Sequence, residues 1–288
     1  MSITRDIKIA LNGTYGTLIR LIFINCIVFI VLNITVSVLT LYGYEPLMAY
    51  KTVSDYSDLP ATPRNLITRF WTLFTYMFVH FGFMHVISNM LWLYFLGKVF
   101  SDILGGARVI GTYVIGGICG GILFILICNL IPNLKNSQLE GASAGVMAIV
   151  IAAAAFSPDY TLFPFGIKIK LKWLALVSFL LTSLLDLTDN TGGKAAHIGG
   201  AVFGLIYGTQ IRKGNTFIDK IMQLLNFNKS KLRIEHSRTE KTIDEIYNLK
   251  KTSVKIRVDE ILDKISRSGY DSLNQSEKEF LQKNHTQF

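Results

Sequence analysis

Two short stretches of this sequence carry a serine and a histidine that could act together as nucleophile and base. Ser143 lies among small residues in GASAG (141–145) and begins an apolar run that ends near Phe156. His197 lies in AHIGG (196–200) and also begins an apolar segment. A polar side chain is costly in lipid, and the free N–H groups of a helix start stabilise negative charge. The two stretches therefore predict nucleophilic serine chemistry, provided that the two side chains meet.

A second set of polar residues precedes another apolar segment. His85 and Asn89 are four residues apart, so they share one face of a helix, and His80 lies just before them. His85 and Asn89 can both donate hydrogen bonds to an oxyanion, to which the backbone N–H of Ser143 adds a third donor. The two histidines could instead bind a metal or haem, but no third ligand has a suitable spacing. We therefore expect neither a metal nor a cofactor.

The composition indicates a polytopic membrane protein. Half of the 288 residues are hydrophobic, and the mean hydropathy of +0.39 argues against a soluble domain. The formal charge of +9 comes mostly from short segments between apolar runs and from the C-terminal region. Lipid headgroups at a cytoplasmic leaflet account for this distribution more simply than nucleic acid does. The three cysteines lie in apolar runs and are interpreted as packing residues: Cys26, Cys119 and Cys128.

Six apolar segments predict an all-α bundle of six membrane spans with both termini on the cytoplasmic side. The first span ends near residue 41, and the others cover about 83–100, 109–131, 143–156, 171–187 and 195–212. The aromatic segment 43–79 between the first two spans is expected to lie in the membrane interface. Basic residues gather in the inner segments, which supports this orientation, and we expect an integral protein of the plasma (inner) membrane.

The same pattern divides the chain into three parts. Residues 1–16 form a cytoplasmic N-terminal segment, residues 17–212 the membrane-embedded core, and residues 213–288 a basic, partly helical cytoplasmic tail. Amphipathic stretches near 217–225 and 258–265, and a helix start at Asn274 with Glu277 three residues later, predict tail helices. Lys229, Lys231 and Arg233 could contact an anionic leaflet. The tail is expected to anchor or regulate, through a partner that the sequence does not identify.

The predicted topology answers whether Ser143 and His197 can meet. The second, fourth and sixth spans run from outside to inside, so their N-terminal ends share one face of the membrane. Small residues at four-residue spacing would let the fourth and sixth spans approach closely: Ala144, Ala148 and Ala152 on one, Gly200, Gly204 and Gly208 on the other. The fourth span rises only about 20 Å against a hydrocarbon core of about 30 Å. Ser143 should therefore lie below the outer surface, in a water-filled cavity.

These residues resemble one known family, the rhomboid intramembrane serine proteases. The resemblance covers roughly residues 18–212 and rests on three motifs: H-x4-H-x3-N (80–89), G-x-S (141–143) and A-H-x2-G-x3-G (196–204). It implies that Ser143 is the nucleophile and His197 the general base, that His85 and Asn89 stabilise the oxyanion, and that His80, Gly141, Gly200 and Gly204 give structural support. It further implies transmembrane protein substrates, cut near their outer ends, and no cofactor.

Some positions depart from the family pattern. Ala144 follows the serine where glycine is frequent, and Met147 stands where an aromatic ring often packs on the histidine. Thr72 and Ser101 replace a frequent arginine and glutamate. Because no Asp or Glu lies within the spans near His197, and Asp186 and Asp189 fall in the preceding loop, a Ser–His dyad is expected rather than a triad.

Two functions of other classes compete with the protease. The first is a catalytically inactive rhomboid-like protein that binds transmembrane helices, against which the intact Ser143 and His197 argue. The second is a small transporter or channel, for which internal repeats and polar groups along the whole depth of the bundle are expected. The sequence contains no such repeat.

Overall fold

The computed structural model of this chain describes residues 9–163, 166–183, 191–215, 217–224, 258, 261–266, 269 and 272–284. Most of these residues are helical, as expected for apolar segments in lipid, where a helix satisfies its own backbone hydrogen bonds. The long helices of the bundle are α2 (Gly16–Leu41), α6 (Phe83–Leu104), α7 (Val109–Leu130), α8 (Ser143–Phe156), α9 (Leu171–Ser183) and α10 (Thr191–Arg212).

Short elements connect and cover these helices. Between α2 and α6 lie α3 (Pro46–Ser57), β1 (Leu59–Pro60), α4 (Pro63–Thr68), α5 (Thr72–Thr75) and the 3₁₀ helix η1 (Tyr76–Phe78). Two further 3₁₀ helices, η2 (Gly106–Arg108) and η3 (Pro132–Leu134), flank α7. The remaining elements are β2 (Gln138–Leu139), β3 (Thr161–Leu162), β4 (Ile169–Lys170), α11 (Phe217–Leu224) and α13 (Gln275–Asn284).

The described helices make the chain an integral membrane protein. Three of them are long and apolar enough to cross a membrane: Gly16–Leu41, Phe83–Leu104 and Gly106–Leu130. The helices α8 and α9 are apolar but shorter. Each of the six apolar segments of the sequence coincides with one long helix, although α10 begins at Thr191, before the expected start near Ala195. A hydropathy pattern does not detect the first turn of α10, because that turn is polar. Its backbone hydrogen bonds form without any apolar side chain.

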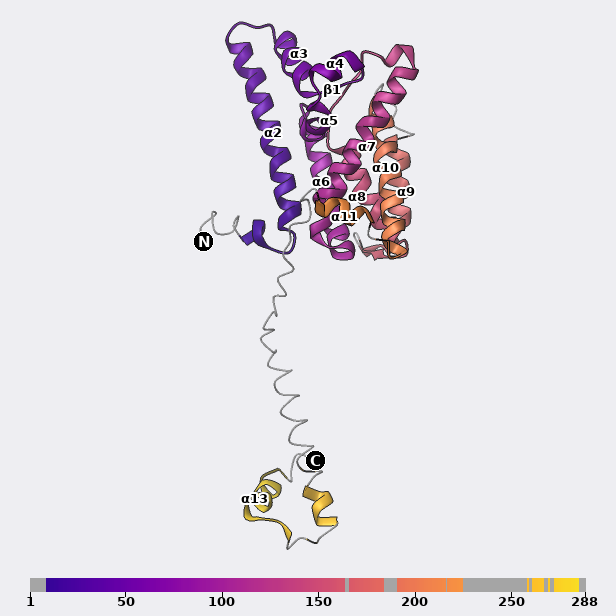
Figure 1. Cartoon of the computed structure of the whole chain (residues 1–288). Coiled ribbons are helices and arrows are strands. Elements are labelled where there is room, and N and C mark those ends of the chain that lie inside the picture. The colour runs from indigo at the N-terminus through magenta and orange to yellow at the C-terminus, as the bar shows by residue number, and fades with distance from the viewer. Residues whose placement is uncertain are drawn as a thin grey trace. The chain divides into compact units, whose positions relative to one another are not determined.

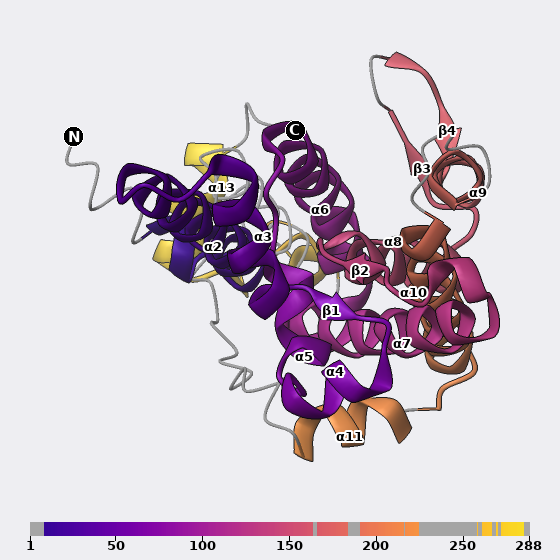
Figure 2. The same cartoon turned by 90° about the horizontal axis from the view of Figure 1, so that it is seen from above.

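Helix α8 lies in the middle of the bundle. Viewed from above, it is surrounded by α6, α7, α9 and α10 (Figure 2). Ten of its fourteen residues are buried, and its sequence is rich in alanine, so neighbouring backbones can approach it closely. The start of this helix, at Ser143, is therefore held by packing on several sides.

The segment between α2 and α6 covers the end of the bundle at which α8 begins (Figure 1). Its strand β1 pairs antiparallel with β2, so that Leu59 lies opposite Leu139, four residues before Ser143. The backbone N–H of Ala61 donates to the carbonyl of Ser137 over 3.0 Å. The first loop and the segment that leads to Ser143 are thus joined by backbone hydrogen bonds.

A short helix beyond the last long helix packs at the opposite end of the bundle. In α11, Asp219 is buried and accepts hydrogen bonds from Arg108 (2.8 Å from Nη2) and from the Tyr207 hydroxyl (2.7 Å). Burial alone would raise the pKa of Asp219, but the hydrogen bonds from Arg108 and Tyr207 hold it below its usual value. Met222 is fully buried against Gly111. Helix α11 is therefore fixed to η2 by an ion pair, to α10 by a hydrogen bond and to α7 by an apolar contact.

The chain forms two compact units, Met1–Ser230 and Lys231–Phe288. In the second unit, α13 begins with the reciprocal hydrogen bonds of a capping box: Glu277 N–H to Asn274 Oδ1, and Asn274 N–H to Glu277 Oε2, both 2.8 Å. The helix start predicted at Asn274 is confirmed. Lys264 pairs with the same glutamate over 2.9 Å. The tail charges Lys229, Lys231 and Arg233, like Asp186 and Asp189 before α10, lie outside the described residues.

Candidate active site

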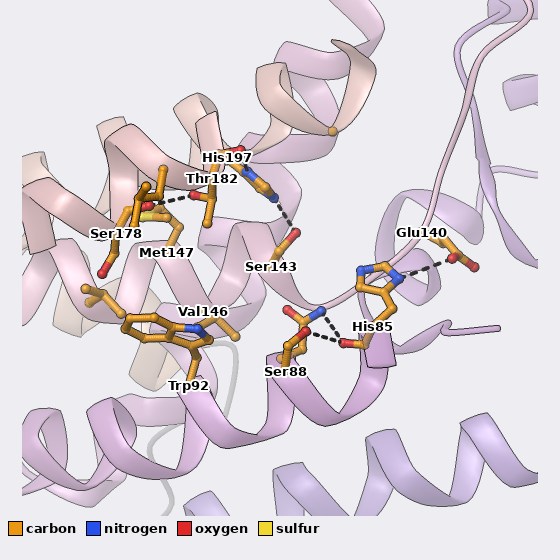
Figure 3. A pocket seen from close by; sticks show the side chains of 14 residues that line it. His85, Ser88, Trp92, Glu140, Ser143, Val146, Met147, Ser178, Thr182 and His197 are labelled. Atoms are coloured by element: carbon orange, nitrogen blue, oxygen red, sulfur yellow. Dashed lines mark hydrogen bonds and ion pairs between the residues drawn. The ribbon is translucent and has the colours of Figure 1, made fainter. Parts of the chain in front are cut away.

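The side chains of Ser143 and His197 meet between α8 and α10. The Ser143 Oγ atom lies 2.6 Å from His197 Nε2, across 54 residues of sequence (Figure 3). This is the distance of a strong hydrogen bond. An imidazole nitrogen at this position can accept the serine proton as the hydroxyl oxygen attacks an electrophile.

The other ring nitrogen of His197 is held by the backbone of α9. Its Nδ1 lies 3.1 Å from the carbonyl oxygen of Thr182. A carbonyl oxygen can only accept, so Nδ1 carries the proton and donates it. The neutral ring then presents the lone pair of Nε2 to Ser143, which is the tautomer that a general base requires.

Close packing of two backbones sets the approach of Ser143 to His197. A Cβ atom added to Gly200 would lie 2.1 Å from the carbonyl oxygen of Ala144, and one added to Gly204 would lie 2.5 Å from that of Ala148. Both distances are far shorter than any real contact. Glycine at these two positions of α10 is what allows the helix to lie directly against α8.

The backbone just before Ser143 is held by groups of the first loop. The N–H of Gly141 donates to the carbonyl of Tyr76 over 3.0 Å, and the N–H of Ala142 donates to His80 Nε2 over 3.2 Å. Gly141 has φ = 107°, a conformation that side chains rarely adopt. His80 is fully buried, and burial followed by the neighbouring His85 lowers its pKa to about 3, so that it stays neutral and accepts.

His85 lies on the opposite side of Ser143 from His197 (Figure 3), and Asn89 lines the same cavity. His85 Nδ1 lies 3.3 Å from Oε1 of Glu140, the residue before Gly141. The Asn89 amide donates one N–H to the carbonyl of His85 over 2.9 Å, which leaves its second N–H for another acceptor. Both residues come from the first turns of α6, as their four-residue spacing predicts.

A cavity of about 470 Å³ joins these groups. One end is polar, with Ser143, His197, His85, Asn89 and Glu140. The lining also includes five apolar side chains: Trp92, Val146, Met147, Val150 and Leu181. The cavity can therefore hold an apolar side chain beside a reacting polar group, as ligand sites of this size usually do.

A second carboxyl group is buried close enough to Glu140 to be affected by its charge. Asp58, at the C-terminal end of α3, is only 4% exposed and accepts a hydrogen bond from the Ser57 hydroxyl over 3.1 Å. Burial, and then the negative charge of Glu140, raise the pKa of Asp58 to about 8. The first loop thus contributes an acid that keeps its proton at neutral pH.

The structure brings together four of the site residues expected from the sequence, since Ser143, His197, His85 and Asn89 all line this cavity. The other four lie behind its wall: His80 and Gly141 support the loop before Ser143, and Gly200 and Gly204 form the contact of α10 with α8. In the described part of the chain, no group of three or more His, Cys, Asp or Glu side chains is placed to hold a metal ion.

Two groups at the site were missed by reasoning from the sequence. Glu140 was a detectable signal, because it is a charged residue directly before the glycine of the G-x-S motif. The carbonyl of Thr182 could not be detected in the sequence, because every residue has a carbonyl and only the tertiary structure selects this one as the partner of His197.

Comparison with known proteins finds two matching families. Residues 68–214 match the family model described as the Rhomboid domain, and residues 241–285 match a family of unknown function, DUF6576. The first match contains every residue of the cavity described above. The second lies within the C-terminal unit.

Three similar curated proteins carry related names. RHOMBOID-like protein 12, mitochondrial, from Arabidopsis thaliana is 29% identical over 51% of this chain and 48% of its own length. Rhomboid protease GlpG from Pectobacterium atrosepticum is 21% identical over 61% of this chain and 60% of its own length. Rhomboid-like protein 16, chloroplastic, from Arabidopsis thaliana is 24% identical over 73% of this chain and 66% of its own length. The chain thus spans about half to two thirds of the length of these relatives.

Proposed function

Because this chain belongs to the rhomboid family, we propose that it is an intramembrane serine endopeptidase that hydrolyses peptide bonds in transmembrane segments of other membrane proteins, near their outer ends. The observation that carries the proposal is the 2.6 Å contact between Ser143 Oγ and His197 Nε2. The names of two of the relatives call them rhomboid-like and do not name a protease activity. The activity of this chain therefore rests on its own residues.

Each residue has a role in the proposed reaction. Ser143 Oγ attacks the substrate carbonyl carbon while His197 Nε2 takes the hydroxyl proton, and the Thr182 carbonyl holds Nδ1–H as the ring becomes positively charged. The oxyanion accepts hydrogen bonds from the Ser143 N–H, His85 and Asn89. His197 then gives its proton to the leaving amine. Water attacks the acyl-enzyme as it transfers a proton to the same nitrogen, which returns this proton to Ser143 Oγ when the acid product leaves.

The proposal includes a topology. Six spans correspond to α2 and α6 to α10, with both termini on the cytoplasmic side, because the basic residues of the intervening segments gather at that side. The cavity then faces the outer side, and residues 213–288 form the cytoplasmic tail. With this orientation we propose the plasma (inner) membrane as its location. The mitochondrial and chloroplastic names of two relatives make organelle membranes the alternative.

A serine-directed covalent probe and a cleavage assay test the proposal together. The full chain in detergent should react with the probe at Ser143 and should cleave a fusion protein that contains a transmembrane segment. Ser143→Ala should do neither, while its thermal unfolding midpoint stays close to that of the wild type. A wild-type chain that binds the segment but neither reacts nor cleaves would instead be an inactive rhomboid-like protein that binds transmembrane helices.

A further inference from the structure

A short hairpin connects α8 to α9, at the end of α8 opposite Ser143. Its strands β3 and β4 pair antiparallel, with Thr161 opposite Lys170 and Leu162 opposite Ile169. Seen from above, the two strands extend outward from the bundle beside α9 (Figure 2). Because this view runs along the long helices, the hairpin extends sideways, into the region that lipid occupies around an integral membrane protein.

The two faces of this hairpin differ in charge. Side chains alternate between the faces of a strand, and apolar residues alternate with lysines over residues 167–172. The apolar face packs on the bundle, since Leu171 is 1% exposed and Leu162 contacts the hydrophobic core. The opposite face, which we call the basic face, carries three lysines: Lys168, Lys170 and Lys172. The bundle therefore leaves the charged face of the hairpin uncovered.

One carboxylate offsets part of the charge of the basic face. Asp159 Oδ1 accepts hydrogen bonds from Lys172 Nζ and Lys170 Nζ, each over 3.0 Å. Lys172 and Lys170 hold the pKa of Asp159 below its usual value, so this carboxyl group stays ionised. Lys168 has no carboxylate partner among the described residues, and its Nζ lies 5.9 Å from the centre of the Phe163 ring. Three ammonium groups thus face a single carboxylate, which leaves the basic face positively charged.

Large apolar side chains are exposed beside the lysines. We call them the apolar rim: Phe163 and Ile167, each 62% exposed, and Trp173, 56% exposed. The Nζ atom of Lys172 lies 5.9 Å from the centre of the Trp173 ring. Aromatic and basic side chains are typical of a membrane interface, where the apolar part meets acyl chains and the charge meets headgroups. A soluble anion could use the lysines, but it would leave the apolar rim in water.

We propose that the hairpin is a binding site for anionic phospholipid in the nearer leaflet. The basic face contacts the phosphate groups, and the apolar rim lies among the upper parts of the acyl chains. Attraction to an anionic leaflet falls off within a Debye length, so it acts on lysines that the apolar rim holds at headgroup depth. Such a site anchors the connection of α8 to α9 and needs no contribution from the Ser143–His197 pair.

Quenching of Trp173 fluorescence by brominated lipid tests the proposal without any assay of cleavage. The sequence has three tryptophans, so Trp71→Phe combined with Trp92→Phe leaves Trp173 as the only one. This full-length chain is placed in phosphatidylcholine bilayers with the same small fraction of brominated lipid, either phosphatidylglycerol or phosphatidylcholine. Brominated phosphatidylglycerol should show a relative affinity at least about fivefold higher, the effect of one lysine near an anionic leaflet.

Charge variants in the same background separate the basic face from general lipid contact. Lys168→Gln, Lys170→Gln and Lys172→Gln combined should abolish the preference for phosphatidylglycerol, whereas Arg at the same three positions should keep it. Asp159→Asn should increase the preference, because it removes the carboxylate that offsets the lysines. Lys51→Gln is the matched control, since this exposed lysine lies on α3 and outside the hairpin. The preference should also weaken at 1 M salt, where the Debye length is about 3 Å.

Three results would overturn the proposal. The first is equal quenching of Trp173 by the two brominated lipids, and the second is an unchanged preference after the three Lys→Gln substitutions. The third is loss of the preference when inorganic phosphate or a polyglutamate peptide is added at constant ionic strength, because the basic face would then bind soluble anions.

A second measurement uses the chain with all three tryptophans, so it does not depend on the folding of the single-tryptophan variant. In detergent, phosphatidylglycerol should raise the thermal unfolding midpoint more than phosphatidylcholine does. This difference should disappear in the triple Lys→Gln variant. Equal shifts with both lipids in the wild type would contradict the site.

Discussion

His197 donates its Nδ1–H to the carbonyl oxygen of Thr182 over 3.1 Å, while its Nε2 faces Ser143 at 2.6 Å. In a Ser–His–Asp triad a carboxylate does the first of these tasks. Here a neutral backbone carbonyl accepts from the ring, and the Ser–His dyad stays a prediction from the sequence. A carbonyl fixes the tautomer and orientation but adds less stabilisation to the imidazolium than a carboxylate would.

The first prediction concerns the dyad as a unit. Ser143→Ala and His197→Ala should each reduce cleavage of a transmembrane test substrate at least about a thousandfold, and the double variant should be no worse, because each removes the same step. The losses are measured as initial cleavage rates in detergent. Thermal unfolding of each variant is the control for folding. Multiplicative losses in the double variant would mean that the two residues act separately.

The second prediction concerns the oxyanion donors. His85→Ala and Asn89→Ala should lower kcat more mildly, each by about a hundredfold, because the Ser143 N–H and the other side chain remain as donors. Met84→Ala is the matched control, since this residue lies in the same turn of α6 but is 75% exposed. Wild-type kcat in both donor variants would remove them from the site.

The third prediction concerns the contact of α10 with α8. Gly200→Ala would place a Cβ atom 2.1 Å from the Ala144 carbonyl, which is backbone and cannot rotate away. Overpacking of this kind costs about 1–3 kcal/mol, so both the unfolding midpoint and the cleavage rate should fall. Val202→Leu enlarges an exposed position of the same helix and should leave both unchanged. Equal stability of the two variants would contradict the close contact.

The fourth prediction concerns pH. Burial and the charge of Glu140 raise the pKa of Asp58 from its ordinary value of 3.8 to about 8, so the folded chain keeps a proton that the unfolded chain loses. The contribution of Asp58 to stability is therefore greatest at low pH and declines as the pH rises from about 4 towards 8. Asp58→Asn cannot lose a proton. Between about pH 5 and pH 8, its unfolding midpoint should fall less than that of the wild type, and parallel curves would refute the shift.

The fifth prediction concerns α11. A chain ending after Ser230 should keep wild-type stability and cleavage in detergent, because it retains the contact of Asp219 with Arg108 and Tyr207. A chain ending after Lys213 should also cleave, since α11 contributes nothing to the cavity, but its unfolding midpoint should be lower. Asp219→Asn should reproduce part of this loss in the full chain. Complete inactivity of a folded chain ending after Lys213 would show that α11 helps to build the active conformation.

The sequence by itself was enough to predict the helices, the family and the candidate site residues. Apolar segments must become helices in lipid, so the pattern of hydropathy alone locates α2 and α6 to α10. The proposed order of the spans predicts that the starts of three helices share one face of the membrane. From their positions at those starts, the sequence predicted four site residues, which line one cavity in the structure: Ser143, His197, His85 and Asn89. The resemblance that they indicated is confirmed by the match of residues 68–214 to the Rhomboid domain.

Only the tertiary structure decided which groups hold those residues in place. The partners of His85 and of Arg108 lie 55 and 111 residues away in the sequence, and no periodicity within one helix can identify a contact that depends on two separate elements. The partner of His197 Nδ1 is a backbone carbonyl, a group that all residues share, so the packing of α9 against α10 alone selects Thr182. Residue type sets the available chemistry, but the protonation state and orientation of each group depend on its neighbours in space.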